Sequence, residues 1–394
     1  MTIGRLYRWL HRGSVILPVL VLCGLILPTV TQAYESERVV LVIIDGLRYS
    51  EGLGDPERTL VPRMSALAEQ GALVSDFQND GITYTSRAIP AIWCGAWTNV
   101  HSFGDPWCDD NSNNYTQLPT VFEYYRKQLD RPADDCIYTL KALCPWRASF
   151  HADYGQSHWP QYHSEGYSDT DVFEETVGVI ANESPRFLLM YLADVDHEGH
   201  GGGWDNYLSA ISTADSLVGE LWDLLKADEN YAGKTTMLVT NDHGRHDYNF
   251  SGHGDDCSGC RQIQLLAIGP DIHQGLVSDV SRTIPDITPT IGELMGFTTE
   301  HATGSPMMEL IDPTASLNQD KTQTPGFLSL HKVFPTPFNA QLNIEYEVPI
   351  SGQSEVTIWN LKAELIKRFE SNNSRGAIQS LVWNGLDQQG VPVE

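Results

Sequence analysis

The sequence has little positive charge: 25 Lys and Arg residues stand against 51 Asp and Glu residues, which gives a net charge of −26. A surface with this excess of acidic residues repels nucleic-acid backbones and anionic membranes. Neither is therefore an expected partner. Long hydrophobic runs are also scarce. The most apolar run, residues 15–27, contains Pro18 and is too short for a comfortable membrane span.

The N-terminal segment has the pattern of an export signal. Arg5, Arg8 and Arg12 precede the apolar run, and residues 31–33 (Thr-Gln-Ala) provide small residues near a cleavage point. We therefore expect residues 1–33 to be a signal peptide, and a retained membrane anchor is the alternative. The mature chain is then expected in the periplasm, at the cell surface or outside the cell.

Cysteine is sparse, and its count bears on the redox chemistry. An even number of cysteines in an exported chain favours disulfide bonds over free thiols. The pair in Cys257-Ser-Gly-Cys260 is also typical of zinc or redox sites, but no second such pair completes a zinc site, so a structural bridge is favoured. The six cysteines beyond residue 33 are Cys94, Cys108, Cys136, Cys144, Cys257 and Cys260.

Buried β-strands alternate with helical patterns between residues 34 and 312, which predicts an α/β domain with a mainly parallel sheet flanked by helices. Residues 98–170 fit this rhythm poorly, and we expect a cap or surface insertion there. Strands are expected at 38–45, 186–196, 234–242 and 262–270, and helices at 61–71, 204–228 and 285–296.

The composition changes near residue 312. Residues 313–326 have the Pro, Thr and Asn content of a linker. Alternating apolar and polar residues in "LNIEYEVP", "SEVTIWNL" and "AIQSLVWNG" then predict a small antiparallel β-sandwich over residues 327–394.

Acidic residues follow three of the predicted buried strands. Asp45 follows "VLVII", Asp194 and Asp196 follow "FLLMYLA", and Asp242 follows "TMLVTN". One such Asp is usually a turn former or a helix cap, but the carboxyl ends of parallel strands lie along one edge of a sheet, where ligands bind. We therefore expect the three acidic stretches to converge.

Histidines accompany two of these acids. Asp196 and His200 lie four positions apart before three glycines, which permit a tight turn that lets both side chains face one ion. Asp242 and His243 are adjacent, and His253 follows in "GHG". Carboxylates with imidazoles suit zinc, manganese or iron better than calcium.

Thr85 precedes a probable helix in "ITYTSRAIPAIWCG". Taken alone, such a hydroxyl is most simply a helix N-cap. The same position also suits a nucleophile that attacks an anion, because helix amides stabilise negative charge there.

Together these residues resemble the alkaline phosphatase superfamily, most closely its phosphodiesterase, nucleotide pyrophosphatase and cofactor-independent phosphoglycerate mutase branches. The likeness covers about residues 38–312 and rests on five motifs in chain order. They are a strand followed by Asp45-Gly46, Thr85 ten residues before Gly95, Asp196-x-x-x-His200, Asp242-His243-Gly244 and the later His253. It implies two divalent ions, zinc first and manganese second. One would be bound by Asp45, Thr85, Asp242 and His243, and the other by Asp196, His200 and His253.

The resemblance implies that Thr85 attacks the phosphorus of a small phosphorylated substrate and forms a phosphothreonine that is then hydrolysed. Asn79 and Arg87 are candidates to bind the nonbridging oxygens. Sulfatases of the same superfamily carry Cys or Ser in a C/S-x-P-x-R pattern, and this chain has Thr85 and no Pro at the third place. A sulfatase-like or phosphonate hydrolase is therefore the second expectation, and a non-catalytic cell-surface binding protein is the third.

The C-terminal segment resembles the sorting domain of type IX secretion cargo, which is related to the β-sandwich of flagellar hook-capping proteins. The family's Asn-Pro-Phe-Asn appears here as residues 336–339, Thr-Pro-Phe-Asn. This likeness implies outer-membrane secretion machinery as a partner. Because that family continues into a further strand, an incomplete sandwich is one expectation for this chain.

Overall fold

The computed structural model describes residues 20–22, 34–102, 114–141, 148–164, 166–312, 329–339, 341–347, 352–359, 365–373 and 378–393. The chain divides into two compact units, one of residues 31–319 and one that combines residues 1–30 with 320–394. Among the described helices, none has the length and apolar character needed to cross a bilayer.

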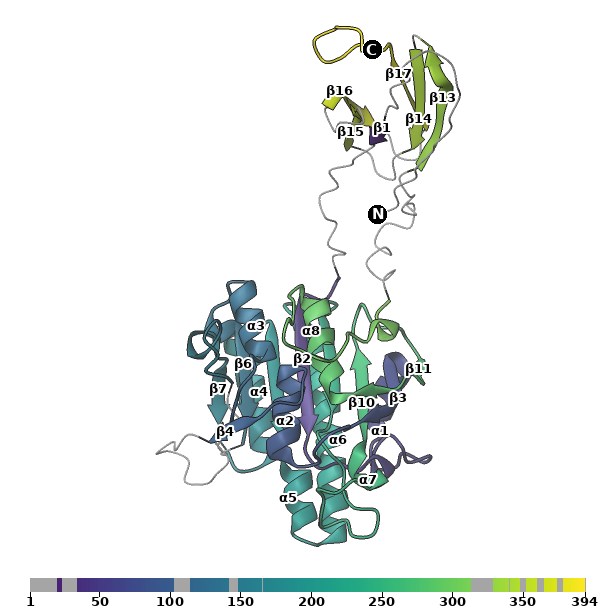
Figure 1. Cartoon of the computed structure of the whole chain (residues 1–394). Coiled ribbons are helices and arrows are strands. Elements are labelled where there is room, and N and C mark those ends of the chain that lie inside the picture. Colours follow the sequence, from purple (N-terminus) through teal and green to yellow (C-terminus); the bar gives the residue numbers. More distant parts are fainter. Residues whose placement is uncertain are drawn as a thin grey trace. The chain divides into compact units, whose positions relative to one another are not determined.

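A nine-stranded mixed sheet forms the centre of the larger unit (Figure 1). The mainly parallel α/β fold expected from the sequence is confirmed. β12 (Arg282–Thr283) pairs with β3 outside the main order. In order the other strands are β11 (Leu276–Ser278), β3 (Ala72–Gln78), β10 (Gln262–Ile268), β9 (Thr235–Thr240), β2 (Arg38–Ile44), β8 (Phe187–Leu192), β6 (Cys136–Leu140) and β7 (Gln161–Ser164).

The central strand β2 is buried on both faces because helices cover both sides of the sheet. Its residues alternate between two apolar cores, with Val39, Leu41 and Ile43 in one and their neighbours in the other. The first core is shared with α2 (Thr85–Cys94), α3 (Val121–Gln128) and α8 (Ile287–Met295). The second is shared with α1 (Pro62–Gln70), α4 (Asp169–Asn182) and α6 (Trp204–Ala227).

One strand departs from the parallel pattern. β10 runs antiparallel to both of its neighbours, β9 and β3. The connection from β9 to β10 contains only the four-residue α7 (Ser258–Arg261), so no crossover helix returns the chain to the opposite edge. Residues 241–261 therefore leave and re-enter the sheet at the same edge, and this loop carries Asp242, His243 and His253.

Part of residues 98–170, expected as a cap or insertion, belongs to the central unit. The segment contributes β6 and β7 to the sheet, and α3 packs on its face. Its short hairpin of β4 (Val100–Ser102) and β5 (Asn114–Thr116) lies outside that sheet. The polar and aromatic composition concealed these elements because each is only four to eight residues long and polar residues interrupt its apolar positions.

The described residues of the smaller unit form two antiparallel three-stranded sheets. Leu342 and Ile344 of one sheet and Val356 and Ile358 of the other share one apolar core, as expected for a sandwich. β1 lies inside the segment expected as a signal peptide, and it pairs with β15. The strands are β1 (Leu20–Leu22), β15 (Gly352–Trp359) and β16 (Leu365–Asn373), then β13 (Ser329–Asn339), β14 (Gln341–Glu347) and β17 (Ile378–Trp383).

The described cysteines are free thiols: Cys94, Cys136, Cys257 and Cys260. The bridge favoured between Cys257 and Cys260 is therefore absent from this structure. Cys108 and Cys144 lie outside the described residues.

Candidate active site

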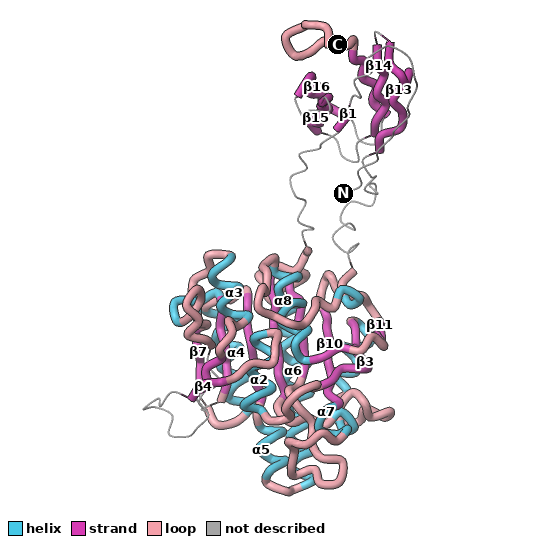
Figure 2. Tube along the Cα trace, in the orientation of Figure 1, coloured by secondary structure: helices cyan, strands magenta, loops and turns pink. Residues whose placement is uncertain are grey.

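The candidate site lies at the carboxyl edge of the central sheet. β2 has β8 on one side and β9 on the other, all three parallel, so the segments that follow them meet at one edge. α5 (Asp194–His200) stands at this edge, together with the loops drawn pink in Figure 2. The acids after the three strands therefore converge, although about 150 to 200 positions separate Asp45 from the other two.

Four of the predicted ligands form a first group. The Thr85 Oγ1 atom lies 3.1 Å from His243 Nε2 and 3.4 Å from Asp45 Oδ1. His243 Nε2 in turn lies 3.4 Å from Asp45 Oδ1 and 3.5 Å from Asp242 Oδ2. The oxygen and nitrogen atoms implied as ligands of one ion therefore face one another.

Thr85 is the first residue of α2 and does not cap it. The N-cap position belongs to Tyr84, and no side chain accepts a capping hydrogen bond there. The Thr85 hydroxyl instead points toward Asp45 and His243. The simple interpretation of Thr85 as an N-cap is therefore wrong, and its hydroxyl lies at the positive end of a helix dipole.

Asp196, His200 and His253 form the second group. His200 Nε2 lies 3.3 Å from Asp196 Oδ2 and 3.0 Å from His253 Nε2, and His253 Nε2 lies 3.6 Å from Asp196 Oδ1. Asp196 and His200 meet because they are four residues apart on α5, one helical turn, and not because the glycines that follow turn the chain.

Gly46 allows the two groups to lie close together. It has a φ of +69°, and a Cβ at this position would come within 2.7 Å of Asp196 Oδ1. Its backbone N–H donates to Asp242 Oδ1. A side chain at residue 46 would therefore push Asp196 away from the first group.

Backbone carbonyls orient the two loop histidines. His243 Nδ1 lies 2.9 Å from the Gly244 carbonyl oxygen, and His253 Nδ1 lies 2.9 Å from that of Thr83. Because a carbonyl only accepts, Nδ1 carries the proton in both rings and each Nε2 presents a lone pair to the site. This is the arrangement in which histidine binds a metal ion.

Within the described part of the chain, two of the three carboxylates, Asp45 and Asp242, lack the positively charged partner that their burial requires. Asp242 is fully buried, and its Oδ2 atom has no hydrogen-bond partner among the described residues. Burial, with the charge of Asp196, raises the pKa of Asp242 to about 7. Burial and the neighbouring Asp242 and Asp196 also raise the pKa of Asp45. A buried acid without a partner is unfavourable, so these residues fit divalent cations.

The surroundings of Asp196 and His253 lower the pKa of both groups. Burial works to raise the pKa of Asp196, but the hydrogen bond from His200 and the neighbouring His243 and Arg245 hold it below the usual range. Burial and the neighbouring His243 lower the pKa of His253 to about 4. At neutral pH this pair therefore offers a carboxylate and a neutral imidazole, the forms that bind metals.

Asn79 and Arg87 lie near the site, and their side chains have partners. The fully buried Asn79 amide donates to the backbone carbonyl of Asp242 at 2.8 Å and to that of Ile82 at 3.3 Å. Arg87 donates to the Thr98 carbonyl. Asn79 thus holds the Asp242 loop, and oxyanion binding by either residue stays a prediction.

Two further side chains contact the predicted ligands and were not assigned from the sequence. The Tyr191 hydroxyl donates to Asp45 Oδ2. The fully buried Arg245 donates from Nη2 to both the carbonyl oxygen and Oδ1 of Asp196, each at 2.6 Å. Tyr191 lies within an apolar strand and Arg245 within a polar loop, so neither pattern distinguished them from ordinary core and surface residues.

Comparisons with known proteins agree with this geometry. The family model for type I phosphodiesterase / nucleotide pyrophosphatase matches residues 39–258. A 2,3-bisphosphoglycerate-independent phosphoglycerate mutase from Colwellia psychrerythraea is 28% identical over 148 residues, which is 36% of this chain and 27% of that enzyme. The same mutase from Gracilaria tenuistipitata is 26% identical over 131 residues, 32% of this chain and 24% of that enzyme. The chain thus spans about a quarter of each curated relative.

Solved structures share the fold at low identity. A 2-O GAG sulfatase has a TM-score of 0.53 at 14% identity, with 85% of this chain and 84% of that chain covered. Murine ectonucleotide pyrophosphatase / phosphodiesterase 5 has a TM-score of 0.52 at 14% identity, with 70% of this chain and all of that chain covered. With the family model matched over more than half of its length, the chain belongs to the type I phosphodiesterase / nucleotide pyrophosphatase family, within the alkaline phosphatase superfamily of hydrolases.

Proposed function

We propose that this chain hydrolyses phosphoric esters with Thr85 as the nucleophile and with two divalent ions, zinc first and manganese second. One observation carries the proposal: the Thr85 hydroxyl has no capping role and lies 3.1 Å from a fully buried imidazole and 3.4 Å from a buried carboxylate. A hydroxyl in this position, at the start of a ten-residue helix, is placed to attack an anionic phosphorus centre.

The described side chains divide into two ligand sets. Asp45, Thr85, Asp242 and His243 would hold one ion, and Asp196, His200 and His253 the other. Bound ions lower the pKa of a nucleophile and neutralise charge on the phosphoryl oxygens. The unpartnered Asp242 Oδ2 and the Nε2 lone pairs of His243 and His253, whose protons lie on Nδ1, support these assignments.

The reaction then follows from the position of Thr85. Its Oγ1 atom loses its proton and forms a bond to phosphorus while the bond from phosphorus to the leaving oxygen breaks. The leaving group departs with the electron pair and takes up a proton, and a phosphothreonine remains. Water attacks this ester, releases phosphate or a phosphomonoester and restores the hydroxyl. The N-terminus of α2 favours the negative charge that develops beside it. Substrate enters from the side of His200, whose side chain is 51% exposed while that of His243 is fully buried.

Phosphodiesters are the first substrate class to test. The matched family is one of phosphodiesterases and nucleotide pyrophosphatases, and an inactive Thr→Ala variant of the murine relative was solved with AMP. Ala88 occupies the place three residues after Thr85 where the diesterase motif has Asn, so a monoester must be compared directly.

The test is hydrolysis of bis-p-nitrophenyl phosphate, p-nitrophenyl phosphate and p-nitrophenyl sulfate after reconstitution with zinc or manganese. We expect diester turnover that Thr85→Ala lowers by about 10³-fold or more. Ser86→Ala is the matched control, since it removes the adjacent hydroxyl and should retain most activity. Unchanged turnover in Thr85→Ala, or no bound metal in the wild type, would refute the proposal.

The sulfate substrate tests the second candidate function. The likeness to a sulfatase structure favours it at the level of fold. The presence of Thr85 where sulfatases have Cys or Ser disfavours it. Turnover of the sulfate ester at the rate of the phosphate esters would replace our proposal by a sulfatase-like one.

We also propose that the chain is exported and that secretion machinery in an outer membrane recognises its C-terminal unit. The basic and apolar N-terminal pattern and the sorting-like tail support this. Cleavage after Ala33 would also remove β1, the strand that pairs with β15. The intact mass of the secreted protein shows whether residues 1–33 have been removed. A chain that keeps Met1 and stays with the cells would contradict export.

A further inference from the structure

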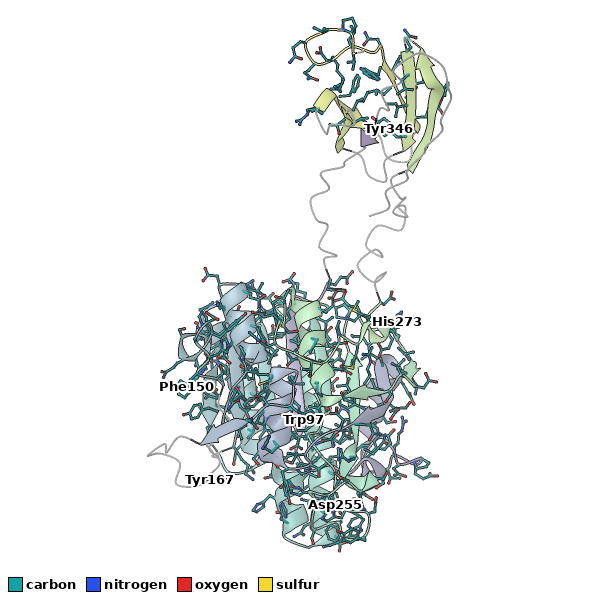
Figure 3. The ribbon with its side chains drawn as sticks, in the orientation of Figure 1. Trp97, Phe150, Tyr167, Asp255, His273 and Tyr346 are labelled. Atoms are coloured by element: carbon teal, nitrogen blue, oxygen red, sulfur yellow. The ribbon has the colours of Figure 1, made fainter. Side chains whose placement is uncertain are left out.

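Four potential metal ligands gather in the loop between β9 and β10, and the proposed reaction uses none of them. They are His246, Asp255, Cys257 and Cys260, which we call the loop cluster. Their ligand atoms all lie within 4.8 Å of one another. Figure 3 labels Asp255 at the end of the larger unit where α5 and α7 lie.

The separations within the loop cluster fit a single small ion. His246 Nδ1 lies 3.0 Å from Asp255 Oδ1, 3.3 Å from Cys260 Sγ and 3.9 Å from Cys257 Sγ. In a tetrahedral zinc site, bonds of about 2.0 Å to nitrogen or oxygen and about 2.3 Å to sulfur place neighbouring ligand atoms roughly 3.3 to 3.7 Å apart. Only small adjustments are needed to bind an ion at the centre.

We propose that the loop cluster binds one zinc ion, separate from the two ions of the proposed active site. Two thiolates exclude calcium and magnesium, which prefer oxygen ligands, and tetrahedral sulfur–nitrogen sites are typical of zinc. Four protein ligands leave no position open for substrate, so this ion is structural. The sequence alone did not reveal the site, because the ligands that complete it are a histidine and an aspartate rather than a second cysteine pair.

Interactions around the loop cluster hold its ligands in place. The second carboxylate oxygen of Asp255 accepts a hydrogen bond from the Tyr248 hydroxyl, while Oδ1 accepts one from the Cys257 backbone N–H. The Tyr248 ring stacks on the His246 ring at 4.9 Å. Such partners fix the orientation of metal ligands in proteins.

Gly259 is the position that brings the two cysteines close to His246. A Cβ there would lie 2.3 Å from the backbone oxygen of Arg245, so only glycine lets α7 approach the chain just before His246. The Gly244 N–H also donates to the Cys260 carbonyl. The Cys-Ser-Gly-Cys turn is thereby pressed against the segment that supplies the third ligand.

A disulfide between Cys257 and Cys260 explains less of this arrangement. It would join the two sulfur atoms and leave His246 and Asp255 directed at them without a role. In the structure both thiols are free, and each sulfur lies within 3.9 Å of His246 Nδ1. One ion satisfies all four groups together.

The ion would also position a residue of the proposed active site. The Thr83 hydroxyl donates to the Asp255 carbonyl at 2.9 Å, and the Thr83 carbonyl accepts from His253 Nδ1. The loop cluster therefore closes residues 246–260 into a ring that carries His253. We expect loss of the ion to loosen His253 and lower kcat by about tenfold.

Cobalt substitution tests the proposal on the full reduced chain. Cobalt bound to thiolate gives ligand-to-metal charge-transfer absorption in the near ultraviolet, and the implied active-site ligands contain no sulfur. With cobalt in excess, we expect a band whose intensity corresponds to one thiolate-bound cobalt per chain and which persists in Thr85→Ala. Cys260→Ser should abolish it, and Cys94→Ala, at a buried cysteine outside the cluster, should retain it.

Metal content gives a second measurement that is independent of activity. His246→Ala should lower bound zinc by one equivalent per chain relative to the wild type. The wild-type spectrum keeps the proposal testable even if a cysteine variant fails to fold. Absence of the charge-transfer band in the reduced wild type, or an intact Cys257–Cys260 disulfide in the purified protein, would overturn the proposal.

Discussion

Tyr191 is the side chain through which the apolar core reaches the candidate active site. Its ring is fully buried in β8, and its hydroxyl donates to Asp45 Oδ2. Burial, with the charge of Asp45, raises the pKa of Tyr191, so the phenol remains a donor at any physiological pH. It holds the Asp45 carboxylate in one orientation and thereby positions a proposed ligand.

The first prediction concerns this hydroxyl. Tyr191→Phe should lower metal affinity and kcat by about 10- to 100-fold, because a partner that orients a ligand is lost. Tyr138→Phe is the matched control: this tyrosine is also fully buried, in the adjacent β6, and its hydroxyl has no hydrogen-bond partner among the described residues. Competition with a chelating dye measures the metal affinity, and assays at increasing metal concentration measure kcat. Equal effects of the two substitutions would contradict the role given to Tyr191.

At the scale of elements, α5 depends on one close contact. A Cβ at Gly199 would lie 2.2 Å from the Arg245 guanidinium carbon, so the absence of a side chain lets Arg245 reach Asp196. A Cβ at Gly178 in α4 would have no heavy atom within 4 Å, so a methyl group there meets open space. The two helices thus contain one glycine that packing requires and one that it does not.

The second prediction compares these glycines. Gly199→Ala should displace Arg245 and lower both kcat and the melting temperature. Gly178→Ala should raise the free energy of unfolding by about 0.5–1 kcal/mol and leave kcat unchanged, because alanine is the better helix former. Urea unfolding and steady-state kinetics measure both effects. A Gly199→Ala variant with normal activity would show that Arg245 does not position Asp196.

At the scale of the whole molecule, the acids of the candidate site link stability to pH and metal. Without metal, the pKa of Asp242 is about 7 in the folded chain against an ordinary 3.8. Between these values the folded chain binds a proton that the unfolded chain has lost. The free energy of unfolding therefore falls as pH rises through this window, by at most about 1.4 kcal/mol per pH unit for one proton.

The third prediction follows from this linkage. Chelated protein should become less stable between about pH 4 and pH 7. Asp242→Asn should reduce that slope, and restored zinc should raise stability most at the upper end, where the carboxylates are ready to bind it. Urea unfolding across this range, with and without chelator, provides the measurement. A slope that Asp242→Asn leaves unchanged would assign the effect to other groups.

The division into two units supports a fourth prediction. All seven proposed ligands lie between residues 45 and 253, within the unit of residues 31–319. A chain that ends after residue 319 should therefore retain the kcat and the metal content of the full chain. The kcat and the bound metal per chain are measured for the two purified proteins. Loss of bound metal on truncation would show that the C-terminal unit contributes to the site.

Local patterns in the sequence were enough to predict most of the central fold. The continuous aliphatic residues of β2, β8 and β9 and the apolar spacing of α1, α6 and α8 were recognisable because strand and helix periodicity repeats over neighbouring residues. The strands β3, β6 and β7 were not predicted, since polar residues leave them without the continuous aliphatic run of β2, β8 and β9. The direction of β10 was missed because it depends on how the chain returns to the sheet.

The sequence by itself determined the kinds of side chain available and, through family resemblance, which acids and histidines belong together. Only the tertiary structure decided which neighbours support them. Tyr191, Asn79 and Arg245 act through contacts across long stretches of chain, and such contacts leave no periodic trace. Three ligands, Asp242, His243 and His253, were predicted in the loop between β9 and β10. The fold also brings His246 and Asp255 of the same loop against Cys257 and Cys260, because the loop folds back on itself at one edge of the sheet.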